Sequence, residues 1–249
     1  MRPDASQKLK AAAPRSGPNP VVIGAVIAAV IVVGVAVAIL IAVNGNTSGS
    51  TANAGSSSSA VPVGVTGGEG GGIVANAATV KSNAPTLDVY EDFQCPICGQ
   101  LEKVLGPTIA SMGQDGDVKL VFHTLSFLDA NLKNDSSSRS ANAAACAADA
   151  GKFLGYHAAV FAGQPTQEGA GYTDAQLTGF ATKSGITGVA LTTWQKCTSS
   201  GQHDKYVADV QTAAEKAGVN STPTVQLNGQ TLTLSTADAL VAQVRAATK

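Results

Sequence analysis

The sequence predicts an α/β domain that follows a transmembrane helix and a flexible linker. Residues 21–43 form one uncharged apolar run. Residues 85–125 have the pattern of a strand, a helix and a second strand, and residues 223–247 that of a hairpin and a closing helix. Residues from about 136 to 218 have the apolar spacing of several helices. We therefore expect one folded unit, residues 73–249, with a helical insertion between two strand-rich parts.

The first 43 residues have the pattern of a membrane anchor. The segment 1–20 carries four positive charges against Asp4, and 23 uncharged residues follow it from Val21 to Val43. At ~1.5 Å per residue this run gives roughly 34 Å of helix, enough to cross a hydrocarbon core of ~30 Å. A cleaved signal peptide has only ~7–15 apolar residues. We expect an uncleaved single-pass helix in the cell membrane, with the stub 1–20 in the cytoplasm and the rest of the chain exported.

Residues 44–72 have the composition of a linker. Of these 29 residues 15 are Gly or Ser, and Glu69 is the only charged one. Such a segment lacks the side chains needed to bury a core. We therefore expect a flexible tether between the membrane and the folded unit.

The folded unit begins with strands and a helix. We expect an edge strand over 73–80, a strand over 85–93 and a helix over 96–113. A turn at Asp115-Gly116-Asp117 leads into an alternating strand over 118–125. Strand, helix and strand in this order predict a parallel pair with a right-handed crossover.

Helices fill the middle of the chain, and a hairpin follows them. The expected helices cover about 140–151, 152–161, 173–185, 189–198 and 202–217. The third begins at a capping box of Thr173 and Gln176. Strands over 223–227 and 231–234 are joined by the tight turn Asn228-Gly229. Ser235 is expected to cap a closing helix that runs to about residue 247.

A Cys-x-x-Cys pair stands where the strand 85–93 passes into the helix 96–113. We expect Cys95 at the helix N-terminus and Cys98 about one turn further on. The free N–H groups and the positive dipole end of a helix stabilise a thiolate and lower its pKa. Cys98 is then placed to attack a mixed disulfide and complete a thiol–disulfide exchange. Half of a zinc site and a purely structural bridge are the alternatives, but no second ligand pair has zinc-site spacing.

Two further cysteines, Cys146 and Cys197, lie in the helical stretch. An even number of cysteines in an exported domain favours a structural disulfide between them. Such a bridge would close a loop of ~51 residues and contribute on the order of 4 kcal/mol at most. A second redox pair and two free buried thiols are the alternatives.

The remaining polar residues have simpler interpretations. Glu91 and Asp92 either move protons or form a solvated strand end, and we expect the latter. His123 is expected to be half-buried on a strand, and His157 and His203 to be surface or packing residues on helices. Residues 73–249 carry 12 Lys and Arg against 15 Asp and Glu without a basic cluster, which argues against a nucleic-acid partner.

Three blocks of the sequence resemble one protein family. They are Asp92-Phe-Gln-Cys-Pro-Ile-Cys98, Gly151-Lys-Phe-Leu-Gly-Tyr-His-Ala-Ala-Val-Phe161 and Ala217-Gly-Val-Asn-Ser-Thr-Pro-Thr-Val-Gln-Leu-Asn-Gly229. In this order, and over nearly all of residues 73–249, they are similar to the DsbA-like thioredoxin-fold thiol:disulfide oxidoreductases. The resemblance implies a thioredoxin core with an inserted helical domain at about 136–218.

The same resemblance implies roles for four residues. Cys95 is the nucleophile and Cys98 the resolving thiol. Thr222–Pro223 carries a cis peptide bond beside the cysteines, and the Thr222 backbone pairs with a bound peptide. Many members have His or Tyr where this chain has Ile97. Because Ile97 neither donates to a thiolate nor lends it positive charge, we expect a less lowered Cys95 pKa and a milder oxidant than the strongest members.

We therefore expect an exported oxidoreductase that introduces disulfides into cysteine-containing exported proteins through Cys95 and Cys98. The resemblance implies reoxidation by a quinone-linked membrane partner of the DsbB or vitamin-K-epoxide-reductase type. An exported reductase or isomerase is the alternative, because Ile97 and Thr222 leave the direction open. A non-catalytic anchored binding module with four structural cysteines is the hypothesis from a different class. We expect no cofactor and no metal.

Overall fold

The computed structural model describes residues 60–68 and 70–248. Within them, five strands form one sheet in the order β1-β3-β2-β4-β5. Their bounds are β1 (Ile73–Val74), β2 (Thr86–Glu91), β3 (Lys119–Thr124), β4 (Thr224–Leu227) and β5 (Gln230–Thr231). β2 and β3 are parallel, with Val89 opposite Phe122, and the other neighbouring strands are antiparallel. The predicted parallel pair is confirmed.

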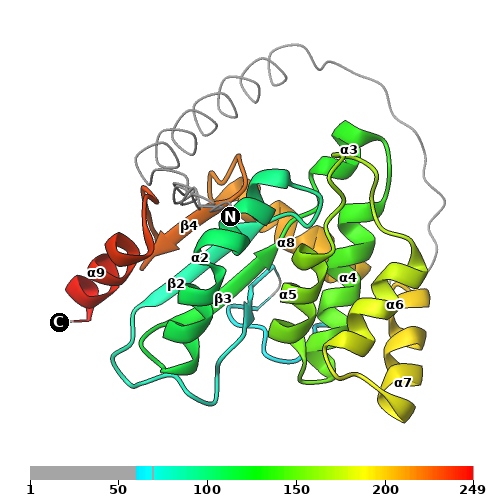
Figure 1. Ribbon diagram of the computed structural model, residues 1–249, viewed down its shortest axis with the longest axis horizontal. Coiled ribbons are helices and arrows are strands. Elements are labelled where there is room, and N and C mark those ends of the chain that lie inside the picture. The colour runs from blue at the N-terminus through cyan, green and yellow to red at the C-terminus, as the bar shows by residue number, and fades with distance from the viewer. Residues whose placement is uncertain (1–59, 69, 249) are drawn as a thin grey trace, which may run out of the picture.

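Helices cover the sheet and form a block beside it (Figure 1). They are α2 (Pro96–Gln114), α3 (Leu128–Leu132), α4 (Ser136–Asp149), α5 (Phe153–Ala162), α6 (Asp174–Lys183), α7 (Gly188–Ser199), α8 (Asp204–Lys216) and α9 (Ala237–Ala247). α2 and α8 both contact β3, and α9 contacts α2. The helices between β3 and α8 lie together to one side of the sheet (Figure 1). The predicted α/β architecture with a helical insertion is confirmed.

The insertion and the sheet share one hydrophobic core. The ring of Phe122 on β3 lies 5.5 Å from that of Phe153 on α5. Within the insertion, the alanine-rich helix α4 lets its neighbours approach closely, and Trp194 of α7 donates from its indole N–H to Ala143 O at 3.0 Å. Because this core is continuous, the insertion is fixed against the part of the sheet that carries the cysteines.

Several element boundaries differ from the prediction, and three of the differences have clear structural descriptions. The edge strand ends at Val74 rather than at 80, because the buried Asn76 side chain turns the chain there by donating to Gly113 O and Val118 O, each at 2.8 Å. The hairpin strand expected over 231–234 is only Gln230–Thr231. The closing helix is capped by Thr236 and not by Ser235, since the Thr236 hydroxyl accepts from Ala239 N.

The folded unit begins earlier than residue 73. Ala60 O accepts a hydrogen bond from His203 Nδ1, and Val63 N donates to Asp149 Oδ1, both at 2.9 Å. Residues 60–68 and 70–72, assigned to the linker from their composition, therefore lie against the helices. Glycine makes this contact possible: at Gly70 (φ +76°), an added Cβ would lie 2.7 Å from Asp209 O.

The predicted stub 1–20, the apolar run 21–43 and the linker residues 44–59 lie outside the described residues. Among residues 60–68 and 70–248, the structure contains no helix with the length and apolar character needed to span a membrane.

Candidate active site

Cys95 and Cys98 lie at the junction of β2 and α2, as predicted. Cys95 is the residue before the helix, Pro96 occupies its first position, and Cys98 follows in the first turn. The turn is fixed by its own backbone, since Cys95 N donates to Asp92 O at 2.9 Å and Gly99 N donates to Cys95 O at 3.2 Å. Both thiols are free, and 7% of Cys95 and 1% of Cys98 is exposed. The more exposed sulfur is the one at the helix N-terminus.

The loop before β4 faces Cys95. β4 pairs with β2, which brings Thr222 next to a cysteine 127 residues earlier in the chain. The Thr222–Pro223 peptide bond is cis, as the resemblance implies. Cys95 Sγ donates to Thr222 O at 3.6 Å. The predicted residues Thr222 and Pro223 therefore adjoin the cysteine pair.

The two thiols differ in acidity. The hydrogen bond from the Cys98 thiol lowers the pKa of Cys95 to about 6, with further contributions from Thr222 and from the N–H groups of Cys98 and Ile97. Burial, together with the interaction with Cys95, raises the pKa of Cys98 well above its ordinary value. At neutral pH the favoured state is thus a Cys95 thiolate beside a protonated Cys98. The Cys95 pKa remains above the ~3.5 of the most acidic thiols of this kind.

A buried acid–histidine pair lies behind the cysteines. Glu91, at the end of β2, and His157, on α5, are each 2% exposed, and Glu91 Oε1 lies 2.6 Å from His157 Nε2. Burial alone lowers the pKa of His157, but Glu91 and then Glu102 raise it above its ordinary value. The charge of Glu91 also contributes to the raised pKa of Cys98. The prediction that Glu91 lies at a solvated strand end was wrong, because its side chain is buried. His157 is a packing residue, which is one of the two interpretations expected for it.

Asp92 is also buried, contrary to the prediction. Its Oδ1 accepts from Gln94 N at 2.8 Å and from the Ser137 hydroxyl at 2.6 Å, and its Oδ2 accepts from Leu128 N at 3.3 Å. Burial raises the pKa of Asp92 to about 7, although these hydrogen bonds oppose the shift. Asp92 therefore ties the loop before Cys95 to helices α3 and α4.

The sequence contained one overlooked signal for His157. It lies at the centre of the apolar stripe of its helix, four residues after Phe153 and four before Phe161. A histidine at such a position is buried and needs a partner. The partner, Glu91, is 66 residues away in the sequence, so only the fold identifies it.

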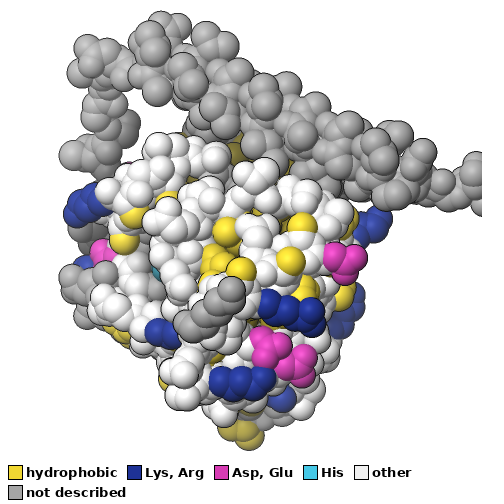
Figure 2. Space-filling view, turned by 90° about the vertical axis from the view of Figure 1, so that its left-hand side faces the viewer, with side chains coloured by type: hydrophobic (Ala, Val, Ile, Leu, Met, Phe, Trp, Pro, Cys, Tyr) yellow, Lys and Arg dark blue, Asp and Glu magenta, His cyan; other side chains and the backbone are white. Residues whose placement is uncertain are grey.

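A mostly apolar groove of about 330 Å³ adjoins the cysteine pair. It runs between α2 and the β4–β5 hairpin, and its lining includes Ile97, Leu101, Val104, Pro223, Leu232 and Leu234. On the side of the molecule that carries α9, hydrophobic side chains gather near the middle of the face (Figure 2). Ile97 and Pro223 place the groove next to the helix turn of Cys95 and the Thr222 loop that faces it.

Comparison with known proteins identifies the family of this chain. A family model described as thioredoxin matches residues 80–246. Reduced DsbG, a disulfide bond oxidoreductase of Mycobacterium tuberculosis, is 31% identical over 68% of this chain and 85% of its own, with a TM-score of 0.57. The chain belongs to the thioredoxin family. Reduced DsbA from the same organism is also 31% identical and covers 68% of this chain and 89% of its own, with the same TM-score of 0.57.

These similarities make the chain a DsbA-like thiol-disulfide oxidoreductase. MdbA, a thiol-disulfide oxidoreductase of Corynebacterium diphtheriae, is 23% identical and has the same fold over 76% of this chain and 96% of its own, with a TM-score of 0.61. Among curated proteins, none matches the chain significantly. The alternative of a non-catalytic binding module does not agree with this family.

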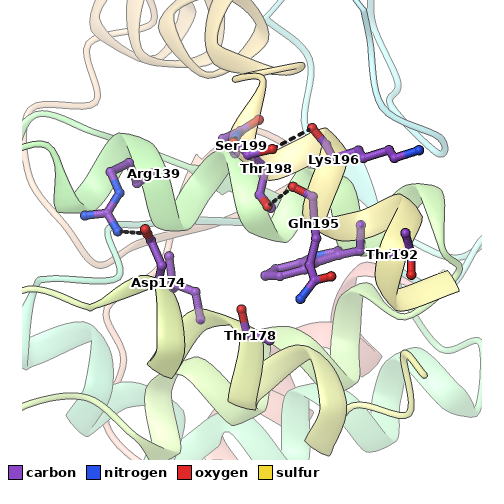
Figure 3. A pocket seen from close by; sticks show the side chains of 11 residues that line it. Arg139, Asp174, Thr178, Thr192, Gln195, Lys196, Thr198 and Ser199 are labelled. Atoms are coloured by element: carbon purple, nitrogen blue, oxygen red, sulfur yellow. Dashed lines mark hydrogen bonds and ion pairs between the residues drawn. The ribbon is translucent and has the colours of Figure 1, made fainter. Parts of the chain in front are cut away.

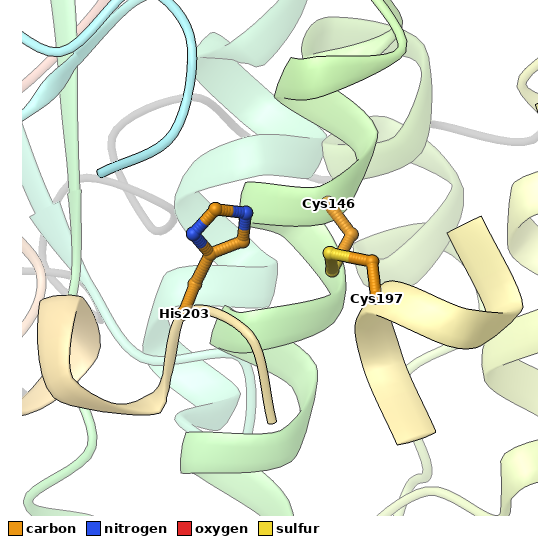
Figure 4. A group of neighbouring side chains, drawn as sticks. All are labelled: Cys146, Cys197 and His203. Carbon is orange, nitrogen blue, oxygen red and sulfur yellow. A yellow bond between two sulfur atoms is a disulfide. The ribbon is translucent and has the colours of Figure 1, made fainter. Parts of the chain in front are cut away.

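The oxidoreductase has a second cysteine pair far from the first in the sequence. Cys146 on α4 and Cys197 on α7 form a disulfide, with their Cα atoms 6.0 Å apart. Their sulfurs and a ring nitrogen of His203 lie within 4.8 Å of one another (Figure 4). Both sulfurs are bonded in the bridge and offer no thiolate to a metal. His203 donates its Nδ1–H to Ala60 O and lies 2.8 Å from Asp149 Oδ2 through Nε2.

A hollow of about 390 Å³ lies within the insertion, between α4, α6 and α7 (Figure 3). Arg139 and Asp174 form an ion pair at one side of it, and Thr178, Gln195 and Lys196 are among its other lining residues. Its lining contains none of the four cysteines. We assign this hollow no part in the exchange reaction.

Proposed function

We propose that this DsbA-like protein is an exported, membrane-anchored oxidase that introduces disulfides into other exported proteins through Cys95 and Cys98. The observation that supports this direction is the contrast between the two thiols. A pKa of about 6 makes Cys95 a stable thiolate in the reduced protein, which favours the reduced form. An enzyme whose reduced form is favoured is an oxidant toward its substrates.

The proposed reaction has two exchange steps. A substrate thiolate attacks Cys95 Sγ of the Cys95–Cys98 disulfide, so that a substrate–Cys95 bond forms and Cys98 leaves as a thiolate that takes up a proton. A second substrate thiolate then attacks the substrate sulfur of this mixed disulfide. The substrate disulfide forms, and Cys95 leaves as a thiolate that its surroundings stabilise. The substrate loses two electrons, and the cysteine pair gains them.

The proton for Cys98 comes from the buried residues behind it in this proposal. Glu91 faces His157, and His157 Nδ1 lies 3.9 Å from Glu102 Oε1. The Glu102 side chain is 25% exposed. In this proposal protons pass between Cys98 and solvent along these side chains, in place of the solvated strand end expected from the sequence.

The groove beside Pro223 supports a protein substrate rather than a small thiol. Its apolar lining offers contacts to an extended segment next to the substrate cysteine. In this proposal the Thr222 backbone pairs with that segment. Exported cysteine-containing proteins are the substrates, and a quinone-linked membrane partner of the DsbB or vitamin-K-epoxide-reductase type removes the two electrons. The apolar run 21–43 anchors the enzyme.

The reduction potential of the Cys95–Cys98 pair tests the direction. Full-length protein is equilibrated with glutathione mixtures, and the free thiols are trapped and counted by mass. We expect a value closer to −120 mV, typical of strong disulfide donors, than to −270 mV, typical of thioredoxin. A value near −270 mV would instead assign the protein as an exported reductase.

Single cysteine variants test the roles of the two thiols. Cys95→Ser should abolish disulfide transfer to a reduced, unfolded substrate and leave the fold intact. Cys98→Ser should accumulate a mixed disulfide through Cys95. Transfer activity that survives in Cys95→Ser would refute the assignment.

A further inference from the structure

The loop after α5 holds the turn that carries Cys95. Gln164 donates from Nε2 to Phe93 O at 2.8 Å and to Cys95 O at 2.9 Å. Tyr172, at the other end of the same loop, donates its hydroxyl to Phe93 O at 2.8 Å. Two carbonyl groups of the active-site turn thus find their partners in the helical insertion.

Gln164 is itself firmly placed. It follows Gly163, where an added Cβ would overlap the ring of Phe180. Its backbone N–H donates to Phe161 O at 3.1 Å, and the Phe161 ring lies 5.1 Å from that of Phe93. The side chain is half-buried. The end of α5 is packed against Phe93 and Phe180, and this packing directs the Gln164 amide toward the turn that carries Cys95.

Gly99 leaves room for this amide. An added Cβ at Gly99 would overlap Oε1 of Gln164. Gly99 lies inside α2 without a positive φ, so its backbone conformation does not require glycine. Its N–H donates to Cys95 O, the same oxygen that accepts from Gln164. The absence of a side chain at Gly99 is thus explained by the space that Gln164 occupies.

We propose that Gln164 is a positioning residue through which the helical insertion controls the reactivity of Cys95. By donating to Phe93 O and Cys95 O, it offsets the negative ends of two carbonyl dipoles beside the thiolate. It also holds the first turn of α2 so that the N–H groups of Ile97 and Cys98 face Cys95 Sγ. The inference rests on the proposed role of Cys95 as the attacking thiol.

Full-length variants test the inference. Gln164→Met keeps the length of the side chain and removes both donors. Gly99→Ala keeps Gln164 and displaces it. Gln195→Ala, on the exposed side of α7, is the matched control. For each reduced variant, the alkylation rate of Cys95 at pH 5, the equilibrium constant with glutathione and the thermal midpoint are measured.

Gln164→Met and Gly99→Ala should each slow alkylation at pH 5 by roughly threefold to tenfold, because a rise of up to about one pKa unit reduces the thiolate fraction by that factor. The glutathione equilibrium should shift toward the protein disulfide. Gln195→Ala should behave like the wild type. The double variant Gly99→Ala and Gln164→Met should lose no more than the more affected single variant, since both changes remove one contact.

Two results would overturn the inference. One is a lower thermal midpoint for Gln164→Met with unchanged alkylation and glutathione equilibrium, which would make Gln164 a packing residue only. The other is an additive loss in the double variant. A wild-type Cys95 without reactivity would refute the proposed function instead, whatever Gln164 does.

Discussion

Hydrogen bonding to Cys95 Sγ sets the pH range over which Cys95 is a thiolate. The pKa of Cys95 is about 6, and the Cys98 thiol is the largest cause of this lowering. We expect the alkylation rate of reduced wild-type protein to rise with pH to a plateau, with a midpoint near 6. Cys98→Ala removes this donor, so the midpoint should move upward. The ultraviolet absorbance of the thiolate measures both midpoints, and equal midpoints would contradict the assigned cause.

The Glu91–His157 pair makes stability depend on pH. Because the pKa of His157 is raised in the folded state, its charged form stabilises the fold fully below about pH 6.5, and this contribution is lost as the pH rises through the folded value. His157→Leu removes the partner of a buried carboxylate and should cost about 3–5 kcal/mol. We expect this loss to be largest at pH 5.5 and smaller at pH 8.5.

Urea unfolding of the His157 variant at several pH values measures this dependence. The double variant Glu91→Gln and His157→Leu is the control, since it leaves no charge without a partner. It should be more stable than His157→Leu alone. A loss of stability in His157→Leu that is the same at every pH would mean that the charge of His157 plays no part.

Residues whose chemistry depends on their chain neighbours were predictable. Cys95 and Cys98 are recognisable from their spacing and from the strand and helix around them, and the Cys146–Cys197 bridge from an even cysteine count. Glu91 was misplaced in solvent because its partner is distant in the sequence. For Gln164 no sequence pattern exists, since its role is defined by two backbone oxygens of another segment.

At the scale of elements, the second disulfide joins two helices of the insertion. Cys146 on α4 and Cys197 on α7 are 51 positions apart. Replacing both by Ser should lower the free energy of unfolding by about 2–4 kcal/mol, because the unfolded chain regains conformational freedom. Urea unfolding measures the loss. The Cys95–Cys98 potential should stay the same, and a changed potential would revive the alternative of a second redox pair.

The long helix after the cysteines agreed with prediction, and the two-residue strands β1 and β5 did not. The helix after the cysteines was expected over 96–113 and is Pro96–Gln114, because its apolar spacing and its first-turn proline are local signals. β1 is two residues long because the Asn76 side chain hydrogen-bonds to residues more than 35 positions later. Such long-range contacts override strand propensity, and the apolar periodicity of the sequence does not reveal them.

At the scale of the whole molecule, residues 60–68 and 70–72 belong to the folded unit. Gly70 tests this contact. Gly70→Ala places a methyl group 2.7 Å from Asp209 O at a positive φ and should cost about 1–3 kcal/mol. Gly68→Ala has a similar φ of +80° with nothing within 4 Å, so it should cost only about 1 kcal/mol. Thermal unfolding compares the two, and equal losses would mean that the packing at Gly70 is not specific.

The overall architecture was predictable because the order of elements fixes the topology. Strand, helix and strand, then helices, then hairpin and helix define the sheet order with few alternatives. The start of the folded unit was not predictable. Glycine-rich composition indicates a tether, but here Gly70 allows close approach to α8, and backbone groups of Ala60 and Val63 bind His203 and Asp149. Composition does not distinguish these two uses of glycine.

Assembly of the site from distant segments has a consequence for the newly made protein. The Cys95 turn is completed by Gln164, His157 and Thr222, which are synthesised 62 to 127 positions after Cys95. Until those segments dock, Cys95 has the acidity of any unfolded cysteine. An incomplete copy is therefore a poor catalyst, and its four thiols are open to oxidation by finished copies. Full exchange activity therefore indicates that the segment carrying Thr222 and the strands after it have docked against β2.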